Sequence, residues 1–194
     1  MKKEYLTAPN LLSLYRIIVF PLILWFILAN NETLFAIFLI INLITDILDG
    51  LIARLLKMQT ELGAKLDSTG DIGTYILAFI GIFVFKWDVI APHILPFLVF
   101  AGLCIVLVIL AWIKFGKVPS FHLYSWKVGG YIQGFFFFTL FAFDFYPVLY
   151  YFMTFWSIFA ALEHIIIQLI IPQMRSNVKG LYWVLRDHQK RKGQ

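Results

Sequence analysis

The chain has 194 residues, of which 61% are hydrophobic and only 14% charged, and its mean hydropathy is +0.85. Soluble domains carry charges on about a quarter of their residues, so this composition excludes an ordinary soluble fold. The formal net charge of +5 would suit nucleic acid, but the sequence contains no nucleic-acid-binding motif, so we expect no nucleic-acid partner. We predict instead a single integral membrane domain.

Six apolar segments are each close to the roughly 20 residues that a helix needs to cross the hydrocarbon of a bilayer. We predict membrane-spanning helices over residues 11–29, 33–55, 66–86, 92–114, 125–144 and 147–171. The predicted fold class is therefore an all-α integral membrane protein with six transmembrane helices. We expect a membrane domain over 1–172, which opens with a short interfacial segment, and a basic tail over 173–194.

The distribution of lysine and arginine predicts the orientation of these helices. If the N-terminus is cytoplasmic, fifteen of the sixteen basic residues fall on the cytoplasmic side and only Lys86 falls on the other. Positive charge concentrates in this way on cytoplasmic loops. We therefore expect a multi-pass protein of the cell membrane with both termini in the cytoplasm. Anionic membrane lipids are expected partners of the basic segments.

Four of the seven aspartates fall within the stretch "DILDGLIARLLKMQTELGAKLDSTGD", residues 46–71. Asp46 and Asp49 are three residues apart on the second predicted helix, and Asp67 and Asp71 are four apart on the third. Each pair therefore lies on one face of its helix. Because the connection is short, the two helices should be antiparallel neighbours. Asp49 should then face Asp67 near the cytoplasmic surface, and Asp46 should face Asp71 more deeply.

Four carboxylates gathered at membrane depth repel one another, and each is costly to bury. A purely structural set of ion pairs with Arg54, Lys57 and Lys65 is the simpler interpretation, but it leaves Asp46 and Asp71 unpaired. Two divalent cations would balance the four charges, and ligands that are all oxygen favour Mg²⁺ or Mn²⁺ over zinc. Two such ions about 3.5–4 Å apart are suited to displacement reactions at phosphorus.

Small residues accompany the aspartates in this stretch. Gly50, Ala53 and Gly63 leave space beside the expected ions for a phosphate-bearing group. Arg54 is placed to supply positive charge to a bound diphosphate.

The pattern Asp46-x2-Asp49-Gly50-x2-Ala53-Arg54-x8-Gly63-x3-Asp67-x3-Asp71 resembles the signature of the CDP-alcohol phosphatidyltransferases at every specified position. The resemblance implies two Mg²⁺ or Mn²⁺ ions on the four aspartates, with Asp71 also acting as the general base. It implies that Gly50, Ala53, Arg54 and Gly63 line the CDP pocket. The implied reaction moves a phosphatidyl group from CDP-diacylglycerol to an alcohol and releases CMP. The resemblance also implies a homodimer.

The alcohol acceptor is less well determined. "PNLLSLYRI", residues 9–17, resembles the opening of phosphatidylglycerophosphate synthases and of cardiolipin synthases in this family, which makes glycerol 3-phosphate the leading acceptor. Phosphatidylglycerol, inositol phosphate and serine remain alternatives. The basic residues that we expect to bind an acceptor phosphate are Lys117, Lys127, Lys114 and Arg175. The positive-inside rule explains these cations equally well.

Two other function classes are compatible with part of the sequence. One is a metal-dependent membrane hydrolase that cleaves a diphosphate with water, and the other is a divalent-cation transporter. The transporter leaves Gly50, Ala53 and Gly63 without a role. Glu163 and His164, which lie deep in the last predicted helix, are expected to make structural hydrogen bonds to another helix.

Overall fold

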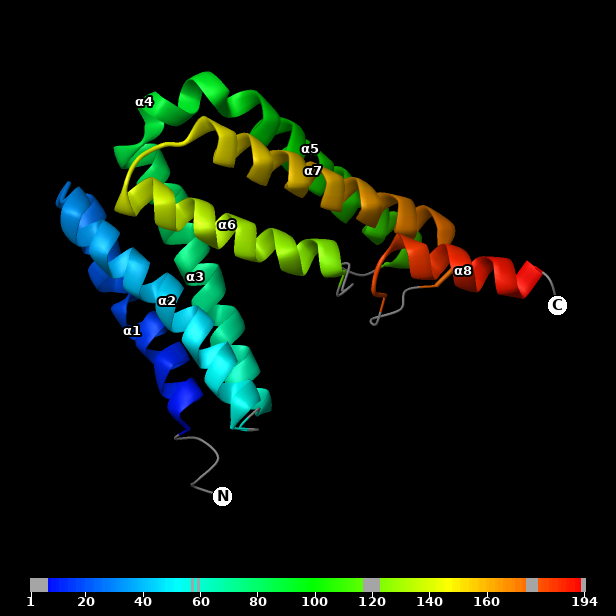
Figure 1. Cartoon of the computed structure of the whole chain (residues 1–194), viewed down its shortest axis with the longest axis horizontal. Coiled ribbons are helices and arrows are strands. Elements are labelled where there is room, and N and C mark those ends of the chain that lie inside the picture. The colour runs from blue at the N-terminus through cyan, green and yellow to red at the C-terminus, as the bar shows by residue number, and fades with distance from the viewer. Residues whose placement is uncertain (1–6, 57, 59, 117–122, 174–177, 193–194) are drawn as a thin grey trace. The chain divides into compact units, whose positions relative to one another are not determined.

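The computed structural model describes residues 7–56, 58, 60–116, 123–173 and 178–192, all of them in helices or their connections (Figure 1). The helices are α1 (Ala8–Leu28), α2 (Glu32–Leu55), α3 (Glu61–Phe85), α4 (Trp87–Ile90), α5 (Ile94–Phe115), α6 (Tyr124–Ala142), α7 (Pro147–Ile170) and α8 (Leu181–Lys192). One 3₁₀ turn, Ala91–His93, joins α4 to α5. Among these described residues there is no strand, as predicted.

Five helical stretches within the described residues are long and apolar enough to cross a membrane: α1, α2, α3, the continuous stretch Trp87–Phe115 and α7. The fifth predicted span, 125–144, coincides with α6, which does not belong to this set. Lys127 and Gln133 place two polar side chains in the first half of α6. The all-helical, membrane-type fold is thus confirmed, whereas a sixth crossing and the orientation remain predictions.

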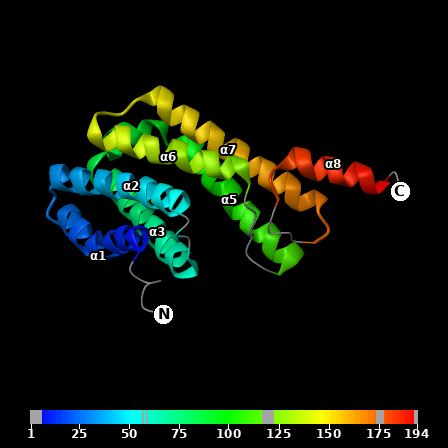
Figure 2. The same ribbon diagram turned by 60° about the horizontal axis from the view of Figure 1, so that its bottom comes forward.

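The described helices form two compact units. The first comprises residues 1–91 and 137–144, and the second comprises residues 92–136 and 145–194. In the first unit α1, α2 and α3 lie side by side (Figures 1 and 2), and α1 packs against both of the other helices. Buried apolar side chains from all three, such as Ile23, Leu39 and Leu77, form the core of this unit.

The connection between α2 and α3 brings their polar ends together. The helix α3 begins at Glu61 because the Thr60 hydroxyl caps it, accepting a hydrogen bond from the backbone N–H of Gly63 at 2.9 Å. At the opposite ends of the same two helices, Lys86 forms an ion pair with Glu32 at 2.7 Å. The two helices are therefore antiparallel neighbours, as predicted, with the aspartates at the end next to the connection.

In the second unit, α5 packs against α7, and α8 packs against the end of α7. The Glu163 carboxylate on α7 accepts a hydrogen bond from the backbone N–H of Leu181, the first residue of α8, at 2.8 Å. This confirms the structural hydrogen bond to another helix that we predicted for Glu163. His164 is buried, with its ring edge-on to Trp126 of α6. The basic tail thus contains a helix that is anchored to the last membrane-type helix.

Candidate metal centre

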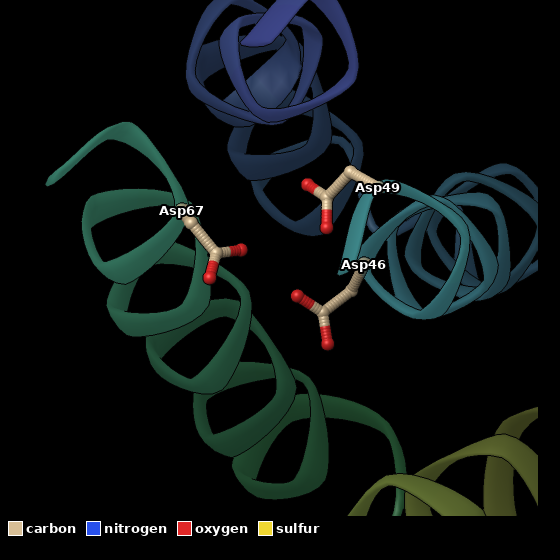
Figure 3. Close-up of side chains that lie close together, drawn as sticks. All are labelled: Asp46, Asp49 and Asp67. Carbon is tan, nitrogen blue, oxygen red and sulfur yellow. The ribbon is translucent and has the colours of Figure 1, made fainter. Parts of the chain in front are cut away.

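Three of the four signature carboxylates converge in the space between α2 and α3. Asp46 and Asp49 project from α2 toward α3, and Asp67 projects from α3 toward them (Figure 3). One ligand oxygen from each of the three lies within 4.8 Å of the others. Asp49 is buried, whereas Asp46 and Asp67 are partly exposed. The geometry is that of a cluster of oxygen ligands with an open side.

The guanidinium of Arg16, on α1, contacts all four aspartates. Its Nη1 donates to Asp46 and, at 2.7 Å, to Asp71. Its Nη2 donates to Asp49 and to Asp67, both at 2.7 Å. Each nitrogen therefore joins one carboxylate of α2 to one of α3. The pairs are Asp46 with Asp71 and Asp49 with Asp67, which confirms the pairing predicted from their spacing.

This arginine overturns one interpretation made from the sequence. Asp46 and Asp71 were expected to have no cationic partner in the protein, but both are paired with Arg16. The signature did not reveal this because the arginine comes from a third helix outside it. A signal was nevertheless present: Arg16 is the only charged residue in α1, and it follows Asn10 and Ser13 at intervals of three. All three side chains are buried.

The charge of the cluster still favours cations. With every group ionised, four carboxylates and one guanidinium leave a net charge of −3. The Arg16 side chain has no exposed surface, and that of Asp49 is 3% exposed. The side chains of Asp46, Asp67 and Asp71 are 40%, 44% and 41% exposed. Oxygen-only donors with excess negative charge and an open side fit hard divalent cations such as Mg²⁺ or Mn²⁺.

Two further residues that were not predicted support this cluster. The Ser13 hydroxyl donates to Oδ2 of Asp49 at 2.8 Å, so the buried carboxylate is held from α1 by both Ser13 and Arg16. Gly70 is buried on α3, where a Cβ atom would lie 3.2 Å from Cζ and from Nε of Arg16. The absence of a side chain at Gly70 therefore provides the space in which the guanidinium lies.

The four residues predicted to line a CDP pocket differ in their surroundings. Gly50 and Ala53 are partly exposed, and Arg54 is exposed, with its Nε donating to the backbone carbonyl of Gly50 at 2.8 Å. At Gly63, by contrast, a Cβ atom would lie 2.5 Å from Oδ1 of Asn10. Gly63 thus permits a close approach of α1 to α3, and its contact with a nucleotide remains a prediction.

The residues predicted to bind the acceptor belong to the second unit or are not described. Lys117 and Arg175 lie outside the described residues. The Lys114 ammonium donates to the backbone carbonyls of Gln168 and Leu169 at 2.7 and 2.8 Å, at the C-terminal end of α7. Lys127 lies over the ring of Tyr124, 5.8 Å from its centroid. Lys114 therefore already stabilises a helix end, as cations commonly do.

Comparison with known proteins identifies the family. A sequence profile described as "CDP-alcohol phosphatidyltransferase" matches residues 6–167. The chain is 41% identical over 66 residues to a CDP-diacylglycerol–glycerol-3-phosphate 3-phosphatidyltransferase of Aquifex aeolicus. The aligned stretch covers 34% of this chain and 37% of that protein. It is 37% identical over 68 residues to an uncharacterized protein of the same organism, covering 35% of each chain. No solved structure matches. Because the profile spans most of its length, the chain belongs to the CDP-alcohol phosphatidyltransferase family.

Proposed function

We propose that this protein transfers a phosphatidyl group from CDP-diacylglycerol to the hydroxyl of glycerol 3-phosphate and releases CMP. The observation that carries the proposal is that all four signature aspartates, from two helices, contact the Arg16 guanidinium in a chain of this family. Glycerol 3-phosphate is favoured by the opening "PNLLSLYRI" and by the printed name of the relative from Aquifex aeolicus.

Asp46, Asp49, Asp67 and Asp71 would hold two divalent cations, on which this family generally depends. Bound Mg²⁺ or Mn²⁺ would polarise the diphosphate and stabilise the charge that develops on the departing CMP. The net charge of −3 on the four carboxylates and Arg16 favours the binding of such cations. The Ser13 hydroxyl keeps the buried Asp49 carboxylate in position for this role.

Asp71 takes the proton from the acceptor hydroxyl in the proposed reaction. The hydroxyl oxygen forms a bond to the phosphorus of the phosphatidyl group, and the bond from that phosphorus to the oxygen of CMP breaks. The Asp71 side chain is 41% exposed, so an acceptor is able to reach it, whereas the buried Asp49 is unsuited to this role. The assignment of the base to Asp71 follows the resemblance to the family.

The surroundings of the substrate are also part of the proposal. Arg54 is exposed beside Gly50, and its terminal guanidinium nitrogens would contact the diphosphate. Gly50, Ala53 and Gly63 would line the CDP pocket, and Lys117 and Lys127 would bind the acceptor phosphate, with Lys114 and Arg175 as weaker candidates. The protein would work as a homodimer with its site on the cytoplasmic face of the membrane, as the distribution of basic residues favours.

A single reaction assay tests the proposal. The purified protein is incubated with labelled CDP-diacylglycerol, Mg²⁺ and, in separate reactions, glycerol 3-phosphate, phosphatidylglycerol, inositol phosphate, serine or no acceptor. We expect equal amounts of CMP and a phosphatidylglycerophosphate product with glycerol 3-phosphate alone. A different lipid product would identify another acceptor. CMP release without any new lipid would support the hydrolase, and metal flux into vesicles without nucleotide would support the transporter.

The Asp71→Asn variant tests the general base. Loss of a general base typically slows a reaction by about 10²–10⁴-fold. We therefore expect turnover to fall by at least that factor while CDP-diacylglycerol binding persists. The matched control is Asp88→Asn, which removes an exposed carboxylate from α4 and should retain activity. Full activity in Asp71→Asn would exclude this residue as the base.

A further inference from the structure

The position of Arg16 raises a question that the proposed function does not answer. Its two terminal nitrogens contact oxygen atoms of all four aspartates, which are the atoms that a pair of metal ions would need. Each nitrogen lies between one carboxylate of α2 and one of α3. The guanidinium therefore contacts the same carboxylates that would hold divalent cations.

We propose that Arg16 is an internal counter-ion that holds the four ligands together in the metal-free protein and gives up part of these contacts when divalent ions bind. Arg16 is thus a positioning residue, and its presence lowers the affinity of the site for metal. The inference rests on the proposed metal-dependent function.

Electrostatics supports competition between the arginine and the metal. A guanidinium stays protonated under all ordinary conditions, so it repels any cation that approaches the same carboxylates. Without metal the same charge is favourable, because four buried or half-buried carboxylates would otherwise face one another uncompensated. The arginine therefore stabilises the metal-free state and opposes the metal-bound state.

The surroundings of the rest of the Arg16 side chain show that its contacts with the aspartates keep it in this conformation. Its Nε is buried and, among the described residues, has no hydrogen-bond partner. A buried donor without an acceptor is unfavourable. The contacts of the terminal nitrogens with the aspartates must therefore outweigh this cost, with Gly70 providing the space. When metal ions take over the carboxylate oxygens, the main reason for this conformation is removed.

Two variants test the inference by independent routes. Arg16→Gln removes the charge. Gly70→Ala keeps the charge but places a Cβ atom 3.2 Å from Cζ and Nε of Arg16, so the guanidinium has to move by a few tenths of an ångström. The matched control is Gly73→Ala on the same helix, where the Cβ atom would also lie 3.2 Å from its nearest neighbour, the apolar ring of Phe20.

The first measurement is the dissociation constant for Mn²⁺ in the absence of nucleotide. It is obtained from the electron paramagnetic resonance signal of the unbound ion. We expect the dissociation constant to fall at least tenfold in Arg16→Gln and several-fold in Gly70→Ala, with no change in Gly73→Ala. The second measurement is thermal unfolding in a chelator and in saturating Mg²⁺. Arg16→Gln should melt below the wild type in chelator and recover in Mg²⁺.

The outcomes separate this inference from the proposed function. If the wild type binds Mn²⁺ but Arg16→Gln and Gly70→Ala bind it equally or more weakly, the inference is wrong and the metal-dependent function stands. If none of the proteins binds Mn²⁺, the metal-dependent function fails and the inference fails with it. If Arg16→Gln does not fold, Gly70→Ala decides, because it retains every ligand and the arginine.

Discussion

Gly63 and Gly50 are both signature glycines, but alanine at each should have opposite effects on stability. A Cβ atom at Gly63 would lie 2.5 Å from Oδ1 of Asn10 and 3.0 Å from Oγ1 of Thr60. Asn10 is only 3% exposed, so its side chain has little room to move away. A Cβ atom at Gly50 would approach only the exposed Arg54, at an ordinary distance of 3.7 Å.

The expected magnitudes follow from two opposing effects. Overpacking costs about 1–3 kcal/mol, whereas replacing a helical glycine by alanine favours the helix by about 1 kcal/mol. Gly63→Ala should therefore lower the free energy of unfolding by up to about 2 kcal/mol, and Gly50→Ala should raise it by about 1 kcal/mol. At about 2–4 °C per kcal/mol for a chain of this size, the melting temperatures should differ by about 2–12 °C.

Thermal unfolding of both variants in detergent, without substrate or metal, measures this difference directly. Because no ligand is present, a lower melting temperature of Gly63→Ala reports on the packing of α1 against α3 and not on the nucleotide pocket. If Gly63→Ala melted at or above Gly50→Ala, the close contact with Asn10 would not be the reason for glycine at this position.

Two further predictions concern parts of the fold outside the aspartate cluster. Gly81→Ala should lower the free energy of unfolding by up to about 2 kcal/mol, because its Cβ atom would lie 2.2 Å from Cζ of the fully buried Phe35 and this overpacking outweighs the helix gain. Gly102→Ala is its control, because no described atom beyond the adjacent backbone of its own helix lies within 4 Å of that Cβ position, and equal losses in both variants would contradict the packing argument. Glu163→Ala should increase hydrogen exchange at the Leu181 amide about fivefold, the effect of losing about 1 kcal/mol. Unchanged exchange there would show that this carboxylate does not anchor α8.

Much of the structure of the first unit is predictable from short-range patterns in the sequence. Apolar length predicts the helices, and intervals of three and four residues place Asp46, Asp49, Asp67 and Asp71 on facing sides of two antiparallel helices. The third helix begins at Glu61 and not at residue 66 as predicted, because Thr60 caps a polar first turn that resembled a loop. Where a helix begins or ends depends on single capping hydrogen bonds of this kind, and a hydropathy pattern does not predict them.

The contacts that the sequence did not predict depend on which faces of the helices pack against one another. Arg16 meets the aspartates only because α1 packs on α2 and α3 with one particular face inward, and no interval within α1 specifies its neighbours. The same packing explains why Gly63 and Gly70 must be small. Similarly, the pattern of Lys127 and Gln133 in α6 does not reveal whether that helix crosses the bilayer.

The order of synthesis gives the Arg16 contacts a consequence for biogenesis. The arginine precedes its four partners by 30 to 55 residues, so α1 leaves the ribosome before any of them does. An arginine at the centre of a lone helix costs about 2.5–3.5 kcal/mol during insertion by the translocon. Insertion of α1 is therefore disfavoured until α2 and α3 arrive. Any truncated product that ends before Asp46 lacks all four carboxylates and leaves the Arg16 charge in α1 without these partners.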